Sequence, residues 1–129
     1  MRHQKNRLLE LETGAKKKSV YIRVLLSNLL KNGKLTTTWK RAKVIKAEAD
    51  HFFSKLLEIS KRNKVETDAK REIVRYVKSV VYGEDTGKRV VEVLFPKYVK
   101  EGTVGGFVAS YDLGFRFGDS APKIMLKLL

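Results

Sequence analysis

The sequence contains no cysteine, and its 129 residues include only two histidines and one tryptophan. Without cysteine there is no disulfide framework, no thiolate metal site and no cysteine nucleophile, and such a composition suits a reducing compartment. Two histidines without any cysteine also argue against a zinc site. The sequence therefore predicts no metal site.

Long apolar runs are also missing. No stretch approaches the roughly 20 apolar residues that a membrane-spanning helix needs, and the charged start MRHQKNRLLELETG lacks the apolar core of a secretory signal. Acidic residues appear by Glu10, which argues against an organellar presequence. We therefore expect a cytoplasmic protein without a membrane partner. Its length is that of one ordinary domain, enough to bury a single core.

Catalytic motifs are absent too. Ser120 and Asp119 would need a histidine, but His3 lies in a segment without periodicity and His51 lies on a predicted helix. Ser120 lacks the Gly-x-Ser-x-Gly context of a nucleophile elbow, and Gly105-Gly106 lacks the lysine of a phosphate-binding loop. We expect no catalytic residue, no cofactor and no small-molecule substrate.

Positive charge is what the sequence has in excess. Its 28 Lys and Arg against 14 Asp and Glu give a net charge of +14. Residues 1–46 hold 13 of the basic and two of the acidic residues, a net of +11, whereas residues 47–82 (8 against 6) and 83–129 (7 against 6) carry +2 and +1. A field this one-sided attracts polyanions, and nucleic acid is the commonest polyanion in a cell.

The apolar periodicity predicts the first half of the fold. Residues 1–15 lack periodicity and form a basic arm, and residues 16–129 form a single RNA-binding domain. A helix is predicted from Lys16 to a stop at Asn32-Gly33, followed by an extended stretch over residues 34–38. Thr38 is the predicted N-cap of a long second helix that ends near Lys61.

The second half contains one ambiguous segment. A third helix is predicted with Thr67 or Asp68 as its cap and Gly83 as its stop. Residues 87–98 suit a strand or a short helix ended by Pro96, and we favour the helix.

The tail alternates strictly, which predicts two half-buried strands joined by the turn GDSAP. In the first strand the buried face is predicted to carry the odd positions Phe107, Ala109, Tyr111, Leu113, Phe115 and Phe117. These elements predict an α+β domain with two layers, its helices on one face of the sheet and a β-hairpin at the C-terminus.

The basic cluster favours binding of folded nucleic acid. Helix N-termini present free N–H groups and a favourable dipole to phosphate, and Lys16, Lys17 and Lys18 start the first predicted helix. The aromatic residues lie mostly on predicted core faces, with Trp39 as the exception, which favours recognition of backbone and shape over single-strand stacking. A free-standing nucleic-acid-binding regulator and a peripheral membrane protein are the alternatives. No dimerisation stripe supports the first, and the apolar helix faces are needed for the core.

Three stretches resemble one known family. They are MRHQK at the start, NGKLTTTWKRAK in the middle, and GGF followed by GFRFGDSAPK near the end. In this order and at this spacing they resemble the seventeenth protein of the bacterial large ribosomal subunit. That family opens Met-Arg-His-Arg-Lys, has Thr-Thr-x-x-Lys-Ala-Lys at a helix start, and ends with Gly-Gly-Tyr and Gly-Phe-Arg-x-Gly-Asp-x-Ala-Pro. This chain departs from it at Glu10 and Glu12, and at Lys40, where proline is common.

The resemblance implies an α-β-α-α-α-β-β domain in which residues 90–95 are helical. It implies a structural role in ribosomes of the bacterial or organelle-encoded type, with large-subunit ribosomal RNA and neighbouring ribosomal proteins as partners, near the exit of the peptide tunnel. It assigns RNA contacts to the arm, to the start of the second helix and to the hairpin arginine. Together with the basic cluster, the predicted RNA-binding residues are Arg2, His3, Lys5, Arg7, Lys16, Lys17, Lys18, Arg23, Thr37, Thr38, Lys40, Arg41, Lys43 and Arg116.

Overall fold

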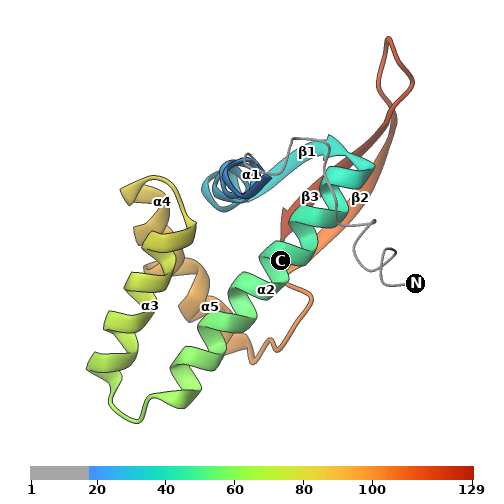
Figure 1. Ribbon diagram of the computed structural model, residues 1–129. Helices are drawn as coiled ribbons and strands as arrows, with labels where there is room; N and C mark the ends of the chain where they lie inside the picture. Colours follow the sequence, from blue (N-terminus) through green and yellow to red (C-terminus); the bar gives the residue numbers. More distant parts are fainter. Residues whose placement is uncertain (1–17) are drawn as a thin grey trace, which may run out of the picture.

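The order of helices and strands matches the predicted α-β-α-α-α-β-β order. This computed structural model describes residues 18–129, with side chains described from Val20 onward. Its elements are α1 (Lys18–Asn32), β1 (Lys34–Thr38), α2 (Trp39–Arg62), α3 (Glu66–Val80), α4 (Glu84–Arg89), η3 (Val90–Leu94), α5 (Phe95–Glu101), β2 (Val108–Phe115) and β3 (Pro122–Leu128) (Figure 1). Because α4, η3 and α5 follow one another without a break, they count as the one helix predicted between the third helix and the hairpin.

The three strands form one antiparallel sheet with β3 in the middle, in the order β1-β3-β2. Leu35 of β1 lies opposite Leu126 of β3, and Val108 of β2 lies opposite Leu128. Both α1 and α2 contact the sheet, and α2 runs across one face of it (Figure 1). This arrangement confirms the two-layer α+β class and the C-terminal hairpin.

The predicted stop of the first helix is confirmed at Gly33. Its φ of 76° is a left-handed conformation that glycine adopts without steric cost, and its N–H donates to the carbonyl of Leu29 over 2.8 Å. The next residue, Lys34, already belongs to β1. The predicted start at Lys16 lies outside the described residues.

Helix α2 provides the centre of the core. Its apolar residues recur at three- and four-residue spacing, so one side of the helix is buried along its whole length. The predicted stripe is confirmed for Ala42, Ile45, Ala49, Phe52, Phe53 and Leu56, and Leu57 packs against the core from a half-buried position. Thr38 lies at the N-cap as predicted, with extended backbone, but its side chain makes no capping hydrogen bond.

Three aromatic rings close the core between α2, α5 and the start of β2. The ring centroids of Phe53, Tyr98 and Phe107 lie 4.9 to 5.1 Å apart in each pair, within the range of favourable edge and tilted contacts. All three side chains are almost fully buried. The cluster therefore ties the helical layer to the base of the hairpin.

Both predicted ends of the third helix were wrong. α3 begins at Glu66, so Thr67 and Asp68 lie inside its first turn and Val65 lies at its N-cap. Acidic residues in a first turn favour the helix dipole, and Glu66 also pairs with Lys70 over 2.7 Å, so the helix starts early. At the other end α3 stops at Val80, and Gly83, with φ 90°, lies at the N-cap of α4 instead.

Residues 90–95 are helical, which resolves the ambiguity in favour of the helix. The expectation that Pro96 ends this helix was wrong, because α5 continues to Glu101 and ends at Gly102 in the left-handed conformation. The turn before the proline is a π-turn, in which the N–H of Phe95 donates to the carbonyl of Val90, five residues back. Widening of this turn accommodates a proline ring that lacks an N–H and would otherwise crowd the preceding turn.

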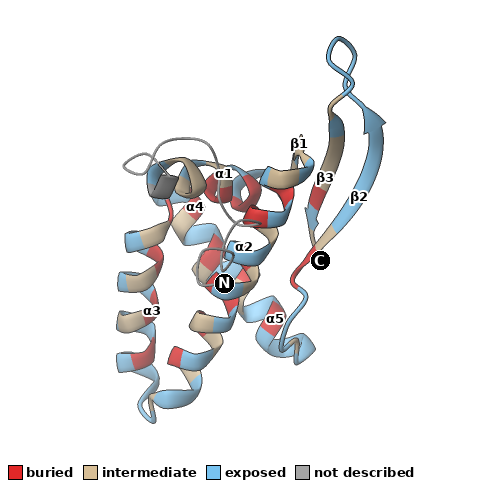
Figure 2. Cartoon of the chain, turned by 45° about the vertical axis from the view of Figure 1, so that its right-hand side comes forward, coloured by how far each residue is buried: buried red, intermediate tan, exposed pale blue. Residues whose placement is uncertain are grey.

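The predicted buried face of the hairpin was wrong for most of its residues. Phe107 is buried, but Tyr111, Leu113, Phe115 and Phe117 are exposed, and Phe117 is fully exposed at 103%. The register places the even positions Val108, Ser110 and Asp112 on the side of Leu126, towards α2. Most of β2 and the hairpin tip extend beyond the helices and are exposed (Figure 2). Alternation therefore indicated a strand correctly, but no helix of residues 18–129 covers the part of β2 where these odd positions lie.

Candidate RNA-binding surface

Cations gather at the start of α2. The sequence from Thr38 changes directly from strand to helix, so Lys40, Arg41 and Lys43 fall within the first two turns, with no acidic residue in the first. Lysine and arginine at a helix N-terminus oppose the helix dipole and do nothing for helix stability. An anion there would be attracted both by these side chains and by the first N–H groups of the helix.

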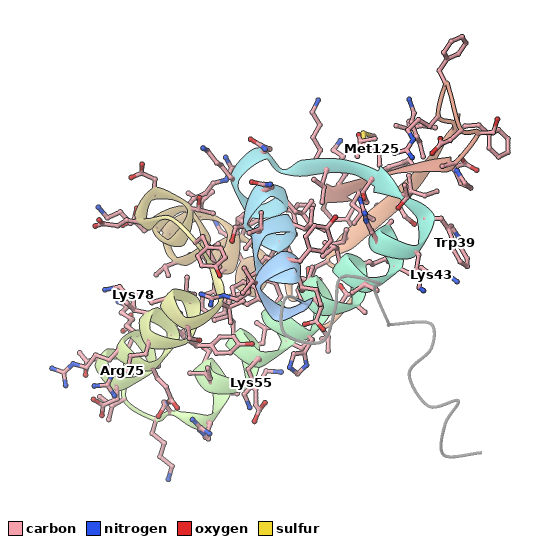
Figure 3. All side chains as sticks on the ribbon, turned by 45° about the horizontal axis from the view of Figure 1, so that its top comes forward. Trp39, Lys43, Lys55, Arg75, Lys78 and Met125 are labelled. Carbon is pink, nitrogen blue, oxygen red and sulfur yellow. The ribbon has the colours of Figure 1, made fainter. Side chains whose placement is uncertain are left out.

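Aromatic rings hold two of these cations. The Nζ of Lys43 lies 3.9 Å from the ring centroid of Trp39, and the guanidinium carbon of Arg41 lies 5.3 Å from the ring centroid of Tyr21. Trp39 is 47% exposed, and it lies beside Lys43 at the surface (Figure 3). The expectation that Trp39 lies outside the core is thus confirmed.

A groove of about 430 Å³ lies between this part of α2 and the sheet. Trp39, Lys43 and Lys46 line it from the helix, and Ser110 lines it from β2. Its one carboxylate, Asp50, accepts a hydrogen bond from the N–H of Phe107 over 2.9 Å. The groove therefore presents two lysines and an indole beside an aspartate that is occupied by the backbone. We did not select Lys46 from the sequence, although its three-residue spacing from Lys43 indicates it.

The other predicted residues differ in where the structure places them. Arg23, on α1, donates from Nε to the carbonyl of Val80 over 3.0 Å, and its guanidinium stacks on Tyr82 at 4.2 Å. Thr37 lies opposite Ile124 on the inner face of the sheet. Lys18 is the first residue of α1, but its side chain lies outside the described part of the chain. The same holds for all of Arg2, His3, Lys5, Arg7, Lys16 and Lys17. These assignments stay predictions.

Arg116 directly follows β2 in the turn of the hairpin, and the hairpin tip extends beyond the helices (Figure 2). Its guanidinium forms a fork with the carboxylate of Asp119, with Nε donating to Oδ1 over 2.9 Å and Nη2 donating to Oδ2. Asp119 Oδ1 also accepts the N–H of Ala121 over 3.2 Å. Arg116 foremost, and then this N–H, hold the pKa of the Asp119 carboxyl well below its usual range.

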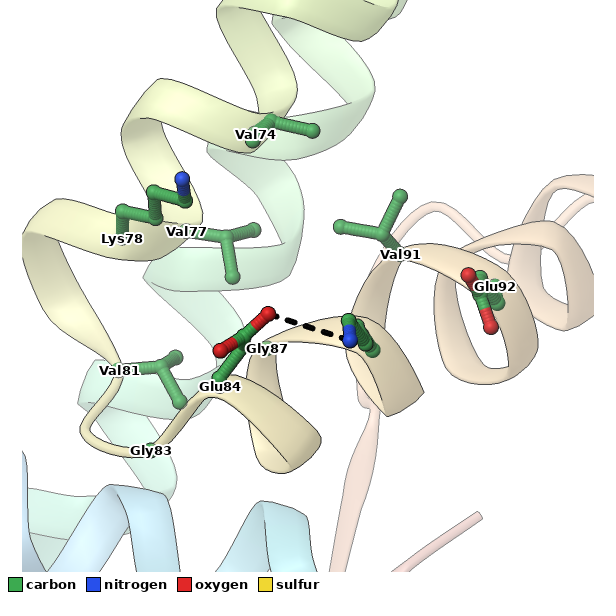
Figure 4. A pocket seen from close by; sticks show the side chains of 10 residues that line it. Val74, Val77, Lys78, Val81, Gly83, Glu84, Gly87, Val91 and Glu92 are labelled. Carbon is green, nitrogen blue, oxygen red and sulfur yellow. Dashed lines mark ion pairs between the residues drawn. The ribbon is translucent and has the colours of Figure 1, made fainter.

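Elsewhere in the described residues the surface offers few candidates for a binding or catalytic site. A hollow of about 580 Å³ lies between α3 and the α4–η3 helix, and four valines, four charged residues and two glycines line it (Figure 4). Its Lys88 and Glu84 pair with each other over 3.1 Å. Among residues 18–129 there is no group of three or more metal-ligating side chains and no helix long and apolar enough to cross a membrane.

Comparison with known proteins decides the family. A family model described as "Ribosomal protein L17" matches residues 21–129. The chain belongs to this family. The large ribosomal subunit protein bL17 of Clostridium novyi is 36% identical to it over 112 residues, which cover 84% of this chain and 85% of that protein. Its counterpart in Clostridium botulinum is 32% identical over 108 residues, again covering 84% and 85%. The one in Moorella thermoacetica is 29% identical over 112 residues, covering 87% and 89%.

The resemblance that the sequence suggested is thus confirmed. As a member of this family the chain is a structural protein of the large ribosomal subunit, is located in ribosomes and takes part in translation. Membership implies association with ribosomal RNA and with other ribosomal proteins. It also implies a structural rather than a catalytic role.

Proposed function

We propose that this protein binds folded ribosomal RNA of the large subunit mainly through phosphate contacts made by its basic N-terminal third. The main support for this proposal is the cationic start of α2, where Lys40, Arg41 and Lys43 surround a helix N-terminus with no acidic residue in the first turn. The same third of the chain holds a net charge of +11 out of +14. Neutralising phosphates releases counterions, which makes such binding favourable and dependent on salt.

The remaining assignments are part of the same proposal. Arg2, His3, Lys5, Arg7 and the lysines at 16–18 extend the phosphate contacts along the arm, and Thr37, Thr38 and Arg116 add further contacts. The protein lies near the exit of the peptide tunnel, beside other ribosomal proteins. The resemblance of MRHQK, TTTWKRAK and GFRFGDSAPK to the family's motifs supports these placements.

The salt dependence of binding tests the phosphate contacts. If about 6–8 cations touch RNA, log affinity should fall with log salt at a slope of roughly −4 to −7. The variant Lys40→Ala/Arg41→Ala/Lys43→Ala should reduce the magnitude of this slope by about 2–3, because each lost phosphate contact removes about one unit.

The matched control removes three other lysines, Lys61→Ala/Lys64→Ala/Lys78→Ala. All three are exposed, none is ion-paired in the described part of the chain, and the change in net charge is the same. Lys78 projects from α3, away from α2 (Figure 3). If both triple variants lower the slope equally, binding depends on overall charge and the proposed surface at the start of α2 is wrong.

A further inference from the structure

The outer sheet face is an open surface, composed of Lys34, Thr36 and Thr38 of β1, Lys123, Met125 and Lys127 of β3, and Ala109 and Tyr111 of β2. The register sets Lys34, Lys127 and Ala109 in one row across the sheet, and Thr36, Met125 and Tyr111 in the next. Successive side chains of a strand point to opposite faces, and the intervening Leu35 and Leu126 pack into the core. Met125 accordingly lies on the other side of the sheet from Trp39 and Lys43 (Figure 3). No helix of residues 18–129 covers this face.

The charge of the outer sheet face is entirely positive. It carries three lysines and no acidic residue. Lys34 and Lys127 lie directly opposite each other, a position in which like charges repel and weaken strand pairing. Among the described residues no carboxylate is within ion-pair distance of any of the three lysines. The sheet therefore holds an unneutralised cationic pair that adds nothing to its own stability.

Two further cations stand at the end of this face where β1 begins and β3 ends. Arg89 and Lys97 line a hollow of about 250 Å³ together with Lys34 and Lys127. The Nη2 of Arg89 lies 3.7 Å from the point that a Cβ on Gly33 would occupy, so the guanidinium lies close over the backbone there. Lys97 has Glu101 at 4.0 Å, whereas no described carboxylate pairs with Arg89. Four elements thus bring four cations around one hollow.

The middle of the outer sheet face is less polar. Tyr111 is 46% exposed beside the half-buried Met125, and Thr36 supplies a hydroxyl in the same row. An exposed aromatic ring between lysines suits a nucleotide, because a base or ribose packs on the ring while the flanking phosphates meet the cations. Threonine hydroxyls suit phosphate or 2′-hydroxyl groups.

We propose that the outer sheet face, with Arg89 at its end, is a second RNA-binding surface that contacts a segment of ribosomal RNA separate from the one at α2. The proposal rests on the proposed function for the kind of partner, and on the charge and geometry of the sheet for the place. Because the two surfaces lie on opposite sides of the sheet, the protein bridges two RNA segments. The separation between these segments corresponds to the thickness of the sheet and of helix α2.

Removing the three sheet lysines tests this surface. In Lys34→Ala/Lys123→Ala/Lys127→Ala the full chain should bind large-subunit ribosomal RNA with a salt slope smaller in magnitude by about 2–3. The control Lys61→Ala/Lys64→Ala/Lys78→Ala, which has the same net charge, should keep the wild-type slope. Circular dichroism melting establishes that each variant is folded. A slope equal to that of the control overturns the second surface.

The variant at the start of α2 separates the two proposals. If Lys40→Ala/Arg41→Ala/Lys43→Ala lowers the slope and the sheet variant does not, the proposed function stands and the second surface is wrong. If the sheet variant alone lowers the slope, the RNA-binding surface proposed at the start of α2 is wrong and the one on the outer sheet face is supported. If both lower it, both are supported.

The absence of cysteine permits a direct test of the two-segment arrangement. A single cysteine introduced by Thr36→Cys on the outer sheet face, or by Ala47→Cys beside the α2 groove, can carry an iron chelate that cleaves nearby RNA. In assembled large subunits the two positions should cut different RNA segments, and exposed Thr67→Cys on α3 serves as the comparison. Cuts from Thr36→Cys no stronger than those from Thr67→Cys, or cleavage of a neighbouring protein alone, overturn the proposal.

Discussion

The Nε of Arg23 donates a hydrogen bond to the backbone carbonyl of Val80 over 3.0 Å, which joins α1 to the last residue of α3. Ser27, one turn further along α1, accepts the N–H of Tyr82 over 2.9 Å and donates to the carbonyl of Arg23 over 2.7 Å. Arg23 also stacks on the ring of Tyr82. A residue whose charge and spacing suggested an RNA contact is therefore engaged in closing the helical layer.

Arg23→Ala should consequently destabilise the protein. It leaves a part-buried carbonyl without its donor, which costs about 1–3 kcal/mol of unfolding free energy. RNA affinity of the folded fraction should be unchanged. Chemical denaturation and RNA titration measure the two effects, with Arg75→Ala as the control, since Arg75 is exposed and makes no ion pair among the described residues. A stable Arg23→Ala variant with weakened RNA binding would contradict this structural role and support the RNA contact predicted for Arg23.

Phe107 and Phe117 should respond oppositely to truncation. Phe107 is fully buried against Phe53 and Tyr98, so Phe107→Ala should cost about 3–5 kcal/mol. Phe117 is fully exposed at the hairpin tip, so Phe117→Ala should change the unfolding free energy by less than about 0.5 kcal/mol. Urea denaturation of the two variants decides the point. Comparable losses would mean that the hairpin face is buried after all.

The hydroxyl of Tyr98 has no hydrogen-bond partner among the described residues, although its side chain is 1% exposed. Tyr98→Phe removes this hydroxyl and keeps the ring contacts with Phe53 and Phe107. Because a buried unsatisfied donor is costly, we expect the variant to be more stable than the wild type by about 1 kcal/mol. A loss of stability in Tyr98→Phe would show that the hydroxyl is satisfied in solution.

The same residue predicts a dependence on alkaline pH. Burial, and secondarily Glu101, raise the pKa of Tyr98 to about 12, against about 10 in the unfolded chain. Between these values the folded state binds more protons than the unfolded state, so stability should fall as pH rises, by up to about 1.4 kcal/mol per pH unit. Tyr98→Phe should remove this part of the decline. Equal slopes in wild type and variant would contradict the raised pKa.

Backbone conformation at the hairpin tip predicts a cost for Gly118→Ala. Gly118 has φ 118°, which L-residues rarely adopt, and a Cβ there meets open space, so the penalty is conformational alone. We expect the substitution to destabilise the turn by about 1–2 kcal/mol. The loss should appear as faster amide hydrogen exchange of Arg116 and Ser120, whose N–H groups close the turn. Gly105→Ala is the control, since its Cβ also meets open space without a positive φ. Equal exchange rates in the two variants would refute the strain.

Titration of Asp119 tests the fork with Arg116. Since its pKa is depressed in the folded state, the fork should contribute to turn stability above the ordinary carboxyl pKa and be lost as pH falls below it. Carboxyl NMR titration should place the Asp119 midpoint clearly below about 3.9, and Arg116→Ala should return it towards that value. An unshifted midpoint in the wild type would contradict the fork between Arg116 and Asp119.

The sequence by itself determined the element order, the core stripe of α2, the glycine stop at residue 33 and the family. Each follows from local chemistry, because a 3.6-residue apolar period, a strand alternation and a φ-permissive glycine act through near neighbours. The excess of lysine and arginine in residues 1–46 needed only counting. The motifs around TTTWK and GFRFGDSAP sufficed for the family without knowledge of any contact.

Only the tertiary structure decided which face of each strand is covered and which cations are free. Alternation in β2 is the same whichever face is buried. No helix of residues 18–129 covers Tyr111 on the outer sheet face or Phe115 and Phe117 near the hairpin tip, so all three are exposed. Arg23 and Arg41 look alike in sequence, yet a carbonyl from α3, 57 residues away, binds the first. The pairing of Lys34 with Lys127 likewise joins residues from the two ends of the domain. Such relationships depend on long-range packing, which local periodicity does not encode.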